Sequence, residues 1–590
     1  MTIALRCISV FSITLTTLAC AAAGGLFADD DSSPTRPPKY EVRAVWLTTV
    51  AGLDWPKSTD RAEQQSSLGE MIEQVERAHF NTIFFQVRGR ADAMYRSRYE
   101  PWSSQLAGAL GKDPGWDPLQ FVLDEAHARG IEVHAWFNTF FVKAGPKPSE
   151  SWPPHLILNH PDWVQQYKEE WWLDPGLPQV RTYLVNVAMD IVRNYDVDGI
   201  HFDFIRYPGP DYPDNATYRR YGKNKKREEW RRENINQFVR AVYDSVVAAK
   251  PWVKVGSTPI GVYVNIQNGS GWQSYHSLFQ DSRAWLREKK HDYLVPQLYW
   301  TLGNRPGDPD FATLAKNWGE NTYGRHIYIG IGAYKPEVFQ QIPEQVDVSR
   351  EAGALGNSYF RFEHISKRWE VGDRYRSRAL IPPMPWKNAV PPNPPTVLSV
   401  TELGEGRFQI KWSMPRAAAD GDRARRIVIY RSLFHPVDID NPWNIVGFVS
   451  GSETSFVDRI ERPTSLRYYY AATSIDRCNN ESLPANEAIA VVSEIEEIGK
   501  RLKPKTTLAE CYPHPSKGIT LVPYEIADPG PVWLKILDLG GRTLEVLVEA
   551  MQSPGRYVAA ANTSTMKDGL YQLQLTAGSV TVSTPLEVRR

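Results

Sequence analysis

The chain has 590 residues with 68 acidic and 68 basic side chains, so its formal net charge is zero. This length exceeds what one hydrophobic core supports, and two to four domains are expected. The neutral charge balance gives no indication of a nucleic-acid or anionic-membrane partner. Aromatic residues are abundant, with 20 Trp and 28 Tyr. They suit a large aromatic core and also suit stacking on sugar rings.

The N-terminal segment has the pattern of an export signal. Arg6 precedes an apolar stretch, Ile8 to Ala19, which small residues follow. Because this stretch is too short to span a membrane, we predict a signal peptide at 1–28 and an acidic, Pro-rich linker at 29–39. Cys20 is a candidate for lipid attachment, and ordinary cleavage after the alanine run fits as well. The protein is therefore expected to be exported, to the periplasm, the cell surface or the medium.

Residues 40–388 alternate strand-like with helix-like segments. Amphipathic patterns such as Arg61 to Ala78 lie between short apolar runs. Such alternation predicts a parallel sheet, and eight units predict a (β/α)8 TIM barrel. A doubly wound sheet would need a Gly-rich phosphate turn after its first strand, and Ala44 to Leu53 has none. The expected strands are Val42 to Val50, Thr82 to Arg88, Glu132 to Asn138, Gly199 to Arg206, Lys254 to Gly261, Asp292 to Trp300, His326 to Tyr334 and Gly356 to Glu363.

The fourth expected strand carries an acidic residue inside an apolar run. Side chains alternate along a strand, so His201, Asp203 and Ile205 are expected on one face. Phe204 and Arg206 are expected on the other. A carboxylate in such a strand is costly to bury unless it is paired or has a chemical role. The structural alternatives are neutralisation by Arg206 and capping of the next helix.

Polar side chains gather at the carboxyl ends of at least five expected strands. A barrel has its active site at this end, whereas a purely structural barrel would fill this layer with aliphatic residues. We therefore expect a functional pocket there, surrounded by Gln86, Arg88, His134, Trp136, Asn138, His201, Asp203, Gln297, Tyr299, Tyr359, Arg361 and Glu363.

The C-terminal third changes to short β-rich runs. Residues 391–492 have the pattern of a β-sandwich, and a linker at 493–508 leads to a second β-sandwich at 509–590. Neither segment clusters His, Asp or Glu, so both are expected to be accessory modules. Cys478 and Cys511 are too few for a disulfide framework or a zinc site, and a single bridge between them is conceivable.

Six motifs in the barrel region occur in a specific order. They are Arg88-Gly-Arg-Ala-Asp92-Ala-Met-Tyr95, Glu100-Pro-Trp-Ser103, Ala126-His-Ala-Arg-Gly130 with His134-Ala-Trp-Phe-Asn138, Leu173-Asp-Pro-Gly176, Asp198-Gly-Ile-His-Phe-Asp203 and Pro296-Gln-Leu-Tyr-Trp300. Together they resemble the glycoside-hydrolase-like barrel family, a former domain of unknown function of bacterial envelope lipoproteins. The resemblance covers about Tyr40 to Pro385 and implies a (β/α)8 glycosidase. Some members are understood to cleave peptidoglycan glycan strands that lack stem peptides.

The sequence departs from this family at two places. Many members have a second Asp where this chain has Phe204, and their Pro-Tyr-Arg is here Thr139-Phe-Phe141. Both places lie at the expected pocket mouth, so the reaction class is better supported than the substrate. Further on, Val397 to Val492 is similar to fibronectin type III domains. Tyr512 to Pro515 and Ile536 to Arg542 resemble C-terminal sorting domains of the type IX secretion pathway, which would supply a secretion-machinery partner.

Glycoside hydrolysis generally uses two carboxyl groups. Asp203 is the first candidate, as nucleophile or base, with a structural salt bridge as the alternative. Glu363 is the candidate acid because it ends the eighth expected strand on the face shared with Tyr359 and Arg361. No pair of His residues has metal-ligand spacing, and neither a metal nor a cofactor is expected.

The predicted substrate-binding residues are polar or aromatic groups near the strand ends. They are Arg88, Asp92, Asn138, His201, Arg206, Gln297, Tyr299 and Trp300. The two arginines could bind a sugar carboxylate or could neutralise Asp92 and Asp203, and Trp300 could stack on a sugar or pack in the core. The predicted function is an exported glycosidase acting on a bacterial envelope glycan. The alternatives are a non-catalytic glycan-binding barrel and a glycosidase for environmental polysaccharide.

Overall fold

The computed structural model describes residues 37–303, 307–369, 371–404, 406–460, 467–491 and 506–589. The predicted signal peptide, Cys20 and most of both predicted linkers lie outside these residues. Two compact units form, one within Arg36–Ile498 and one containing Gly499–Arg590. Within the described part, no helix is long and apolar enough to cross a membrane.

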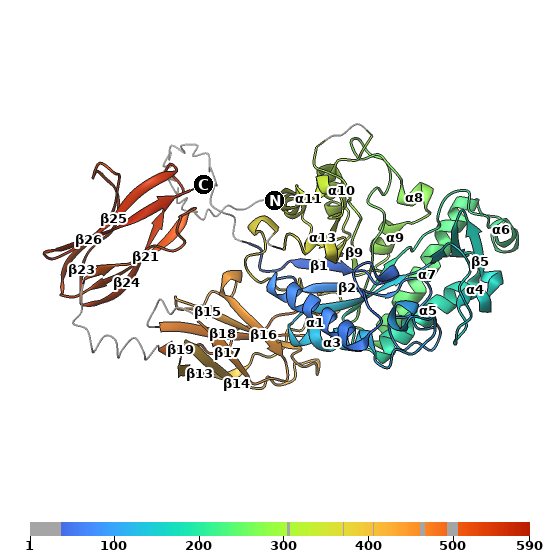
Figure 1. Ribbon diagram of the computed structural model, residues 1–590, viewed down its shortest axis with the longest axis horizontal. Coiled ribbons are helices and arrows are strands. Elements are labelled where there is room, and N and C mark those ends of the chain that lie inside the picture. Colours follow the sequence, from blue (N-terminus) through green and yellow to red (C-terminus); the bar gives the residue numbers. More distant parts are fainter. Residues whose placement is uncertain are drawn as a thin grey trace, which may run out of the picture. The chain divides into compact units, whose positions relative to one another are not determined.

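The first unit contains the predicted barrel (Figure 1). Its strands form one parallel sheet in the order β10-β9-β8-β7-β3-β2-β1-β12-β11. β10 and β11 are two halves of one chain segment, and because one half pairs with β9 and the other with β12, the sheet closes. The (β/α)8 prediction is confirmed. The strands are β1 (Val42–Leu47), β2 (Thr82–Arg88), β3 (Glu132–Asn138), β7 (Gly199–Asp203), β8 (Lys254–Ser257), β9 (Tyr293–Leu294), β10 (His326–Ile327), β11 (Ile329–Ile331) and β12 (Gly356–Tyr359).

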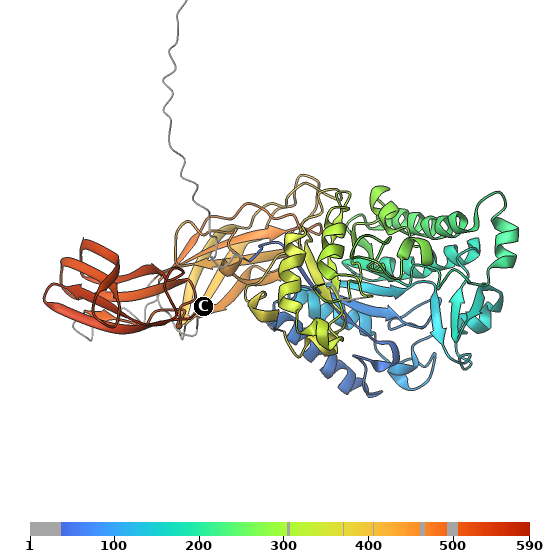
Figure 2. The same cartoon turned by 90° about the horizontal axis from the view of Figure 1, so that it is seen from above.

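Helices flank the barrel strands in both views (Figures 1 and 2). Several begin at an Asp whose carboxylate accepts a backbone N–H of the first turn, as Asp60, Asp117 and Asp310 do. The main helices are α1 (Arg61–Arg77), α3 (Pro118–Ala128), α5 (Pro178–Asn194), α7 (Arg227–Ala249), α9 (Ser282–Arg287), α10 (Phe311–Gly319) and α12 (Ile342–Glu351). Shorter pieces are η1 (Val50–Gly52), α2 (Ser104–Ala107), α4 (Leu156–Asn159), η2 (Pro161–Trp163), α6 (Asn215–Tyr221), α8 (Ser274–Ser277), α11 (Pro336–Phe339), α13 (Phe362–Ile365) and η3 (Val371–Asp373). A small sheet, β4 (Phe141–Ala144), β5 (Val164–Tyr167) and β6 (Glu170–Leu173), follows β3.

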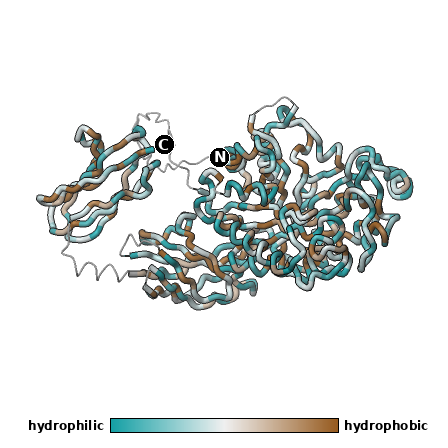
Figure 3. The backbone as a smooth tube through the Cα atoms, viewed as in Figure 1, coloured by the Kyte–Doolittle hydropathy of each residue, from teal (hydrophilic) through white to brown (hydrophobic). Residues whose placement is uncertain are grey.

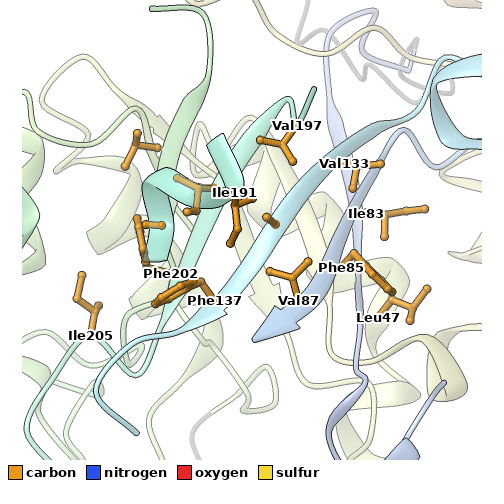
Figure 4. Packing of buried hydrophobic residues seen from close by; sticks show 14 of the residues in the cluster. Leu47, Ile83, Phe85, Val87, Val133, Phe137, Ile191, Val197, Phe202 and Ile205 are labelled. Atoms are coloured by element: carbon orange, nitrogen blue, oxygen red, sulfur yellow. The ribbon is translucent and has the colours of Figure 1, made fainter. Parts of the chain in front are cut away.

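Apolar side chains fill two layers of the barrel. Those facing outward pack against the helices, and Figure 4 shows Phe137 and Phe202 in one layer with Ile191 of α5. Those facing inward form a separate aromatic cluster that includes Trp46 and Tyr293. Hydrophobic stretches alternate with hydrophilic ones along the backbone of both units in Figure 3. The interior below the carboxyl ends of the strands is thus a packed core and not a pore.

Several strands end earlier than predicted. β7 stops at Asp203 because Phe204 has φ 51°, in the left-handed region that a strand does not use. β9 covers only Tyr293–Leu294, and Pro296 has no N–H to continue the ladder. The alternation predicted beyond Asp203 is therefore wrong: Ile205 turns into the outer core.

The first β-sandwich belongs to the same unit as the barrel. It has a three-stranded sheet, β13-β14-β17, and a four-stranded sheet, β16-β15-β18-β19, all antiparallel. The strands are β13 (Thr396–Gly404), β14 (Arg407–Ser413), β15 (Arg426–Ser432), β16 (Ile445–Ser450), β17 (Ser455–Arg459), β18 (Arg467–Ile475) and β19 (Ala488–Val491), with η4 (Pro442–Asn444) between β15 and β16. Its Asn479 donates to Glu132, 3.1 Å away at the start of β3, so it contacts the amino-terminal end of the barrel.

The second unit is also a pair of antiparallel sheets, β20-β21-β24 and β23-β22-β25-β26. Its strands are β20 (Thr507–Leu508), β21 (Ile519–Ile526), β22 (Gly530–Leu537), β23 (Thr543–Gln552), β24 (Gly555–Asn562), β25 (Gly569–Ala577) and β26 (Val580–Val588). Cys511 lies in this unit and Cys478 in the first, and both are free and buried. The structure gives no support to the bridge that the sequence left open.

Candidate active site

A cavity of about 250 Å³ opens at the carboxyl ends of the barrel strands. Its walls come from the last residues of the strands and from the loops that follow them. We call it the barrel cavity; it is lined by Trp46, Thr48, Val50, Leu53, Gln86, Trp136, Asn138, Phe141, Asp203, Phe204, Arg206, Thr258, Gln297, Tyr299 and Phe360. Of the predicted site residues, Asn138, Asp203, Arg206, Gln297 and Tyr299 meet here.

Asp203 is the one carboxyl group in this lining. It ends β7 directly beside Asn138 of β3 in the sheet register. Its Oδ1 accepts the backbone N–H of Phe204 at 2.7 Å. Burial raises the pKa of Asp203 to about 6, against the opposing effects of the Phe204 N–H, the Arg206 charge and the Trp136 indole. The carboxyl group therefore exchanges its proton near neutral pH, as a general acid or base must.

Arg206 brings a second charge to the barrel cavity without pairing with Asp203. Its guanidinium lies 5.0 Å from the ring centres of Phe204 and Trp272 and 5.4 Å from that of Trp172. Such cation–π contacts hold a guanidinium in place without using its N–H donors. Burial lowers the pKa of Arg206 to about 10. For both groups, burial shifts the pKa more than the attraction between the two opposite charges does. No ion pair joins Asp203 and Arg206 in the described structure.

Three buried polar atoms on the cavity wall have no protein partner in the described structure. They are Thr48 Oγ1, Trp136 Nε1 and Asn138 Oδ1. The three side chains are only 2–3% exposed. The Trp136 N–H is close enough to favour the ionised form of Asp203, but its geometry is not that of a formed hydrogen bond. Since a buried polar group without a partner costs free energy, these atoms are suited to bind a polar ligand.

Gln297 and Tyr299 form another part of the cavity wall. The Gln297 amide donates weakly to the carbonyl of Thr258 at 3.4 Å. The Tyr299 ring stacks on Phe360, with centroids 5.8 Å apart. Burial raises the pKa of Tyr299 well above its usual range, so its hydroxyl stays protonated and can donate. An aromatic surface with polar ends is a suitable wall for a sugar.

Asp92 lies outside the barrel cavity, in a neighbouring hollow. This loop hollow is formed by the segments after β1, β2 and β3, has a volume of about 320 Å³ and includes Arg90, Asp92, Lys143 and His155 in its lining. The Asp92 carboxylate accepts the backbone N–H of Arg90 at 2.8 Å.

His134, Tyr359 and Arg361, which were expected around the pocket, line neither the barrel cavity nor the loop hollow. The same holds for four residues predicted to be catalytic or substrate-binding. Arg88 is buried in a two-pronged ion pair with Glu100, because a bulge after Gln86 turns the end of β2. His201 stacks on Phe84 within the barrel core, centroids 4.0 Å apart, and accepts the Trp46 N–H at 3.1 Å. Trp300 packs against the outer core. Their predicted contact with substrate receives no support from these positions.

Glu363 is the fourth of these residues. It lies in the first turn of α13, its side chain is 47% exposed, and it forms an ion pair with Arg361 at 2.7 Å. That contact lowers the pKa of Glu363, which makes the carboxyl group a poor proton donor near neutral pH. The carboxylate of the nearby Asp54 is also occupied by structural contacts. It accepts two backbone N–H groups and forms an ion pair with Arg361.

The sequence interpretation missed several wall residues. Trp46 and Thr48 come from the end of the first strand, and Thr258 comes from the fifth. Thr48 and Thr258 are polar residues directly after buried strands, which is the same signal that identified Asn138. Phe360 gave no such signal because an aromatic residue at this place equally suits packing, whereas Phe141, expected at the pocket mouth, does line the cavity.

The sequence of the barrel matches a known family over residues 41–347, described as glycosyl hydrolase-like 10. Glycosyl hydrolase YngK of Bacillus subtilis (strain 168) is 32% identical over 496 residues, which cover 75% of this chain and 92% of YngK. The chain belongs to the glycosyl hydrolase-like 10 family. Glycosyl hydrolase DigH of Escherichia coli (strain K12) is 35% identical over 331 residues, 51% of this chain and 75% of DigH. Membership in glycosyl hydrolase-like 10 confirms the predicted glycosidase class.

Solved structures resemble this glycosyl hydrolase-like 10 chain more distantly. The glycoside hydrolase domain of PgaB (BpsB) from Bordetella bronchiseptica superposes with a TM-score of 0.42 and 15% identity. The superposition covers 58% of this chain and 100% of that domain.

Proposed function

We propose that Asp203 is the catalytic proton carrier of a glycosidase whose substrate occupies the barrel cavity. The supporting observation is a single carboxyl group on the cavity wall whose burial raises its pKa to about 6. A carboxyl group with a raised pKa is the usual proton donor in glycoside hydrolysis. This assignment replaces the nucleophile or base role that the sequence suggested.

In the proposed reaction, protonated Asp203 gives its proton to the glycosidic oxygen as the bond from that oxygen to the anomeric carbon breaks. Water then adds to the anomeric carbon and returns one proton to the Asp203 carboxylate. The net change is one water consumed and two hydroxyl groups formed. Because the lining offers no second carboxylate, a group of the substrate supports the cationic anomeric carbon, as in substrate-assisted glycosidases.

The proposed substrate is a bacterial envelope glycan, with peptidoglycan strands that lack stem peptides as the first candidate. Unpaired Trp136 N–H and Asn138 Oδ1 atoms on the wall suit the hydroxyl and acetamido groups of such sugars. We further propose that the protein is exported and that its sandwiches are a fibronectin type III-like domain and a sorting-like domain. The paired antiparallel sheets of both segments support this.

The test compares wild type with Asp203→Asn and with Asp124→Asn, an exposed change on α3. Release of reducing ends from stripped peptidoglycan strands and a polysaccharide panel is measured. We expect Asp203→Asn to lower kcat by roughly 10³-fold or more and Asp124→Asn to retain full activity. Wild-type turnover in Asp203→Asn would refute the assignment. Glycan retention on immobilised wild type without any cleavage would favour the non-catalytic alternative.

A further inference from the structure

The loop hollow adjoins the barrel cavity. Val50 lines both of them. Asn138 of the barrel cavity donates to the carbonyl of Gly89, a lining residue of the loop hollow, at 2.9 Å. A glycan that extends beyond the barrel cavity on this side would therefore place a neighbouring sugar in the loop hollow.

The loop hollow carries an excess of unneutralised positive charge. The Arg90 guanidinium has no hydrogen-bond or ion-pair partner in the described part of the chain. Among the described residues, the Lys143 ammonium donates only to the backbone carbonyls of Ala144 and Pro146. Burial lowers the pKa of Lys143, and the charge of Arg90 lowers it further. An anion placed between the two cations would relieve this repulsion.

The remaining titratable groups of the loop hollow leave that excess in place. Asp92 contributes one negative charge and already accepts the backbone N–H of Arg90. Burial lowers the pKa of His155, which favours the neutral form of its ring. Its two ring nitrogens contact the Arg90 carbonyl at 2.9 Å and the Ile157 N–H at 3.3 Å. Two cations thus face one anion and a neutral ring.

We propose that the loop hollow is a subsite for a carboxylate carried by the sugar next to the one cleaved at Asp203. The proposal rests on the proposed function, since it concerns the same glycan. The guanidinium of Arg90 offers a planar pair of N–H donors that matches a carboxylate, and Lys143 adds a point charge. Ser103 and Gln105, also in the lining, suit the sugar hydroxyls.

Two kinds of sugar supply such a group, the lactyl ether of muramic acid and the C6 carboxylate of a uronic acid. The test uses full-length protein and two polymers, stripped peptidoglycan strands and an alternating glucuronate–N-acetylglucosamine polymer. Each polymer is used as such and after conversion of its carboxylates to methylamides. Binding is measured in an Asp203→Asn background so that turnover does not consume the ligand, and kcat/KM is measured in the wild-type background.

We expect amidation to weaken binding of one polymer by about 10-fold or more, as for loss of a charge-assisted hydrogen bond. Arg90→Gln and Lys143→Gln should weaken binding of the native polymer and leave that of the amidated one unchanged. The control Arg219→Gln, exposed on α6, removes the same charge elsewhere and should change neither. The polymer that responds identifies the source of the carboxylate.

Equal binding of native and amidated forms of both polymers would overturn the subsite. So would loss of affinity for both forms alike in Arg90→Gln, because a structural role would affect them equally. Cleavage of both forms with equal kcat/KM would refute the subsite and leave the proposed function standing. Charge-dependent binding without any cleavage would keep the subsite and refute the proposed function.

Discussion

Asp203 and Arg206 lie in one cavity without forming an ion pair, and their shared burial sets the pH response of the site. The Arg206 charge lowers the pKa of Asp203, although burial raises it more. We predict that Arg206→Gln raises this pKa further. If protonated Asp203 is the active form, kcat/KM falls as pH rises through its pKa. The alkaline limb of the pH profile should therefore move to higher pH in the variant.

The measurement is kcat/KM between about pH 4 and 9 for wild type, Arg206→Gln and Arg219→Gln. The last variant should follow wild type. A limb that stays in place or moves toward acid would contradict the proposed coupling of Arg206 to Asp203. A limb that falls on the acid side in wild type would show that the ionised carboxylate is the active form.

The same raised pKa predicts an effect on stability. An aspartate titrates near 3.9 in the unfolded chain and at about 6 here, so the folded state binds the proton more tightly between these values. Stability therefore falls as pH rises from about 4 to 6, and the loss is complete above that window. Asn cannot ionise, and the cavity gives Asp203 some access to solvent. Asp203→Asn should be more stable than wild type by about 1–2 kcal/mol at pH 8 and similar at pH 3.5.

Denaturant unfolding of both proteins at the two pH values tests this. Asp124→Asn, with its exposed carboxylate, should show no comparable difference. A gain in stability that is equal at both pH values would indicate a packing effect and not the ionisation of Asp203.

The positions of Asp203 and Asn138 in the cavity could be predicted from the sequence, because both residues end regular strands in the expected register. The orientation of Arg206 could not be predicted. It depends on the left-handed backbone at Phe204, a residue type that rarely adopts that conformation. Glu363 was misplaced for a similar reason, since β12 ends at Tyr359 and the chain enters α13.

Individual elements explain why Arg88 belongs to the scaffold. The bulge in β2 directs its guanidinium to Glu100, at 2.7–3.0 Å, and to backbone carbonyls at the end of β3. Removal of one partner leaves the other charge buried and unpaired. We predict that Arg88→Met lowers the free energy of unfolding by about 3–5 kcal/mol.

The double variant Arg88→Met/Glu100→Leu should recover a substantial part of that loss, because no charge then remains buried. Denaturant unfolding of the single and double variants provides the comparison. Equal destabilisation in both would mean that packing, not the unpaired carboxylate, dominates at the end of β2. Period-two alternation could not predict this pair, since it ignores the bulge.

At the scale of the whole molecule, the barrel and the first sandwich share a core. Leu380, after the last barrel helices, packs in one apolar cluster with Val428, Tyr430 and Ile475 of the sandwich. Glu132 forms a buried ion pair with Lys254 at the amino end of the barrel. The same carboxylate accepts a hydrogen bond from Asn479 of the sandwich. The sequence predicted both folds from their periodicity. It could not predict this joint core, because an apolar residue type does not specify which other segment it packs against.

This joint core predicts different outcomes for two truncations. A chain that ends at residue 498 keeps the whole first compact unit and should retain the melting temperature of the barrel and wild-type kcat/KM. A chain that ends at residue 390 exposes Leu380 and removes the Asn479 contact of Glu132. It should melt several degrees lower or fail to fold, since buried apolar area and a buried polar partner are both lost. Calorimetry of both truncated chains and of the full-length protein measures these melting temperatures. An unchanged melting temperature after truncation at 390 would show that the barrel is stable by itself and that the sandwich is a separate module.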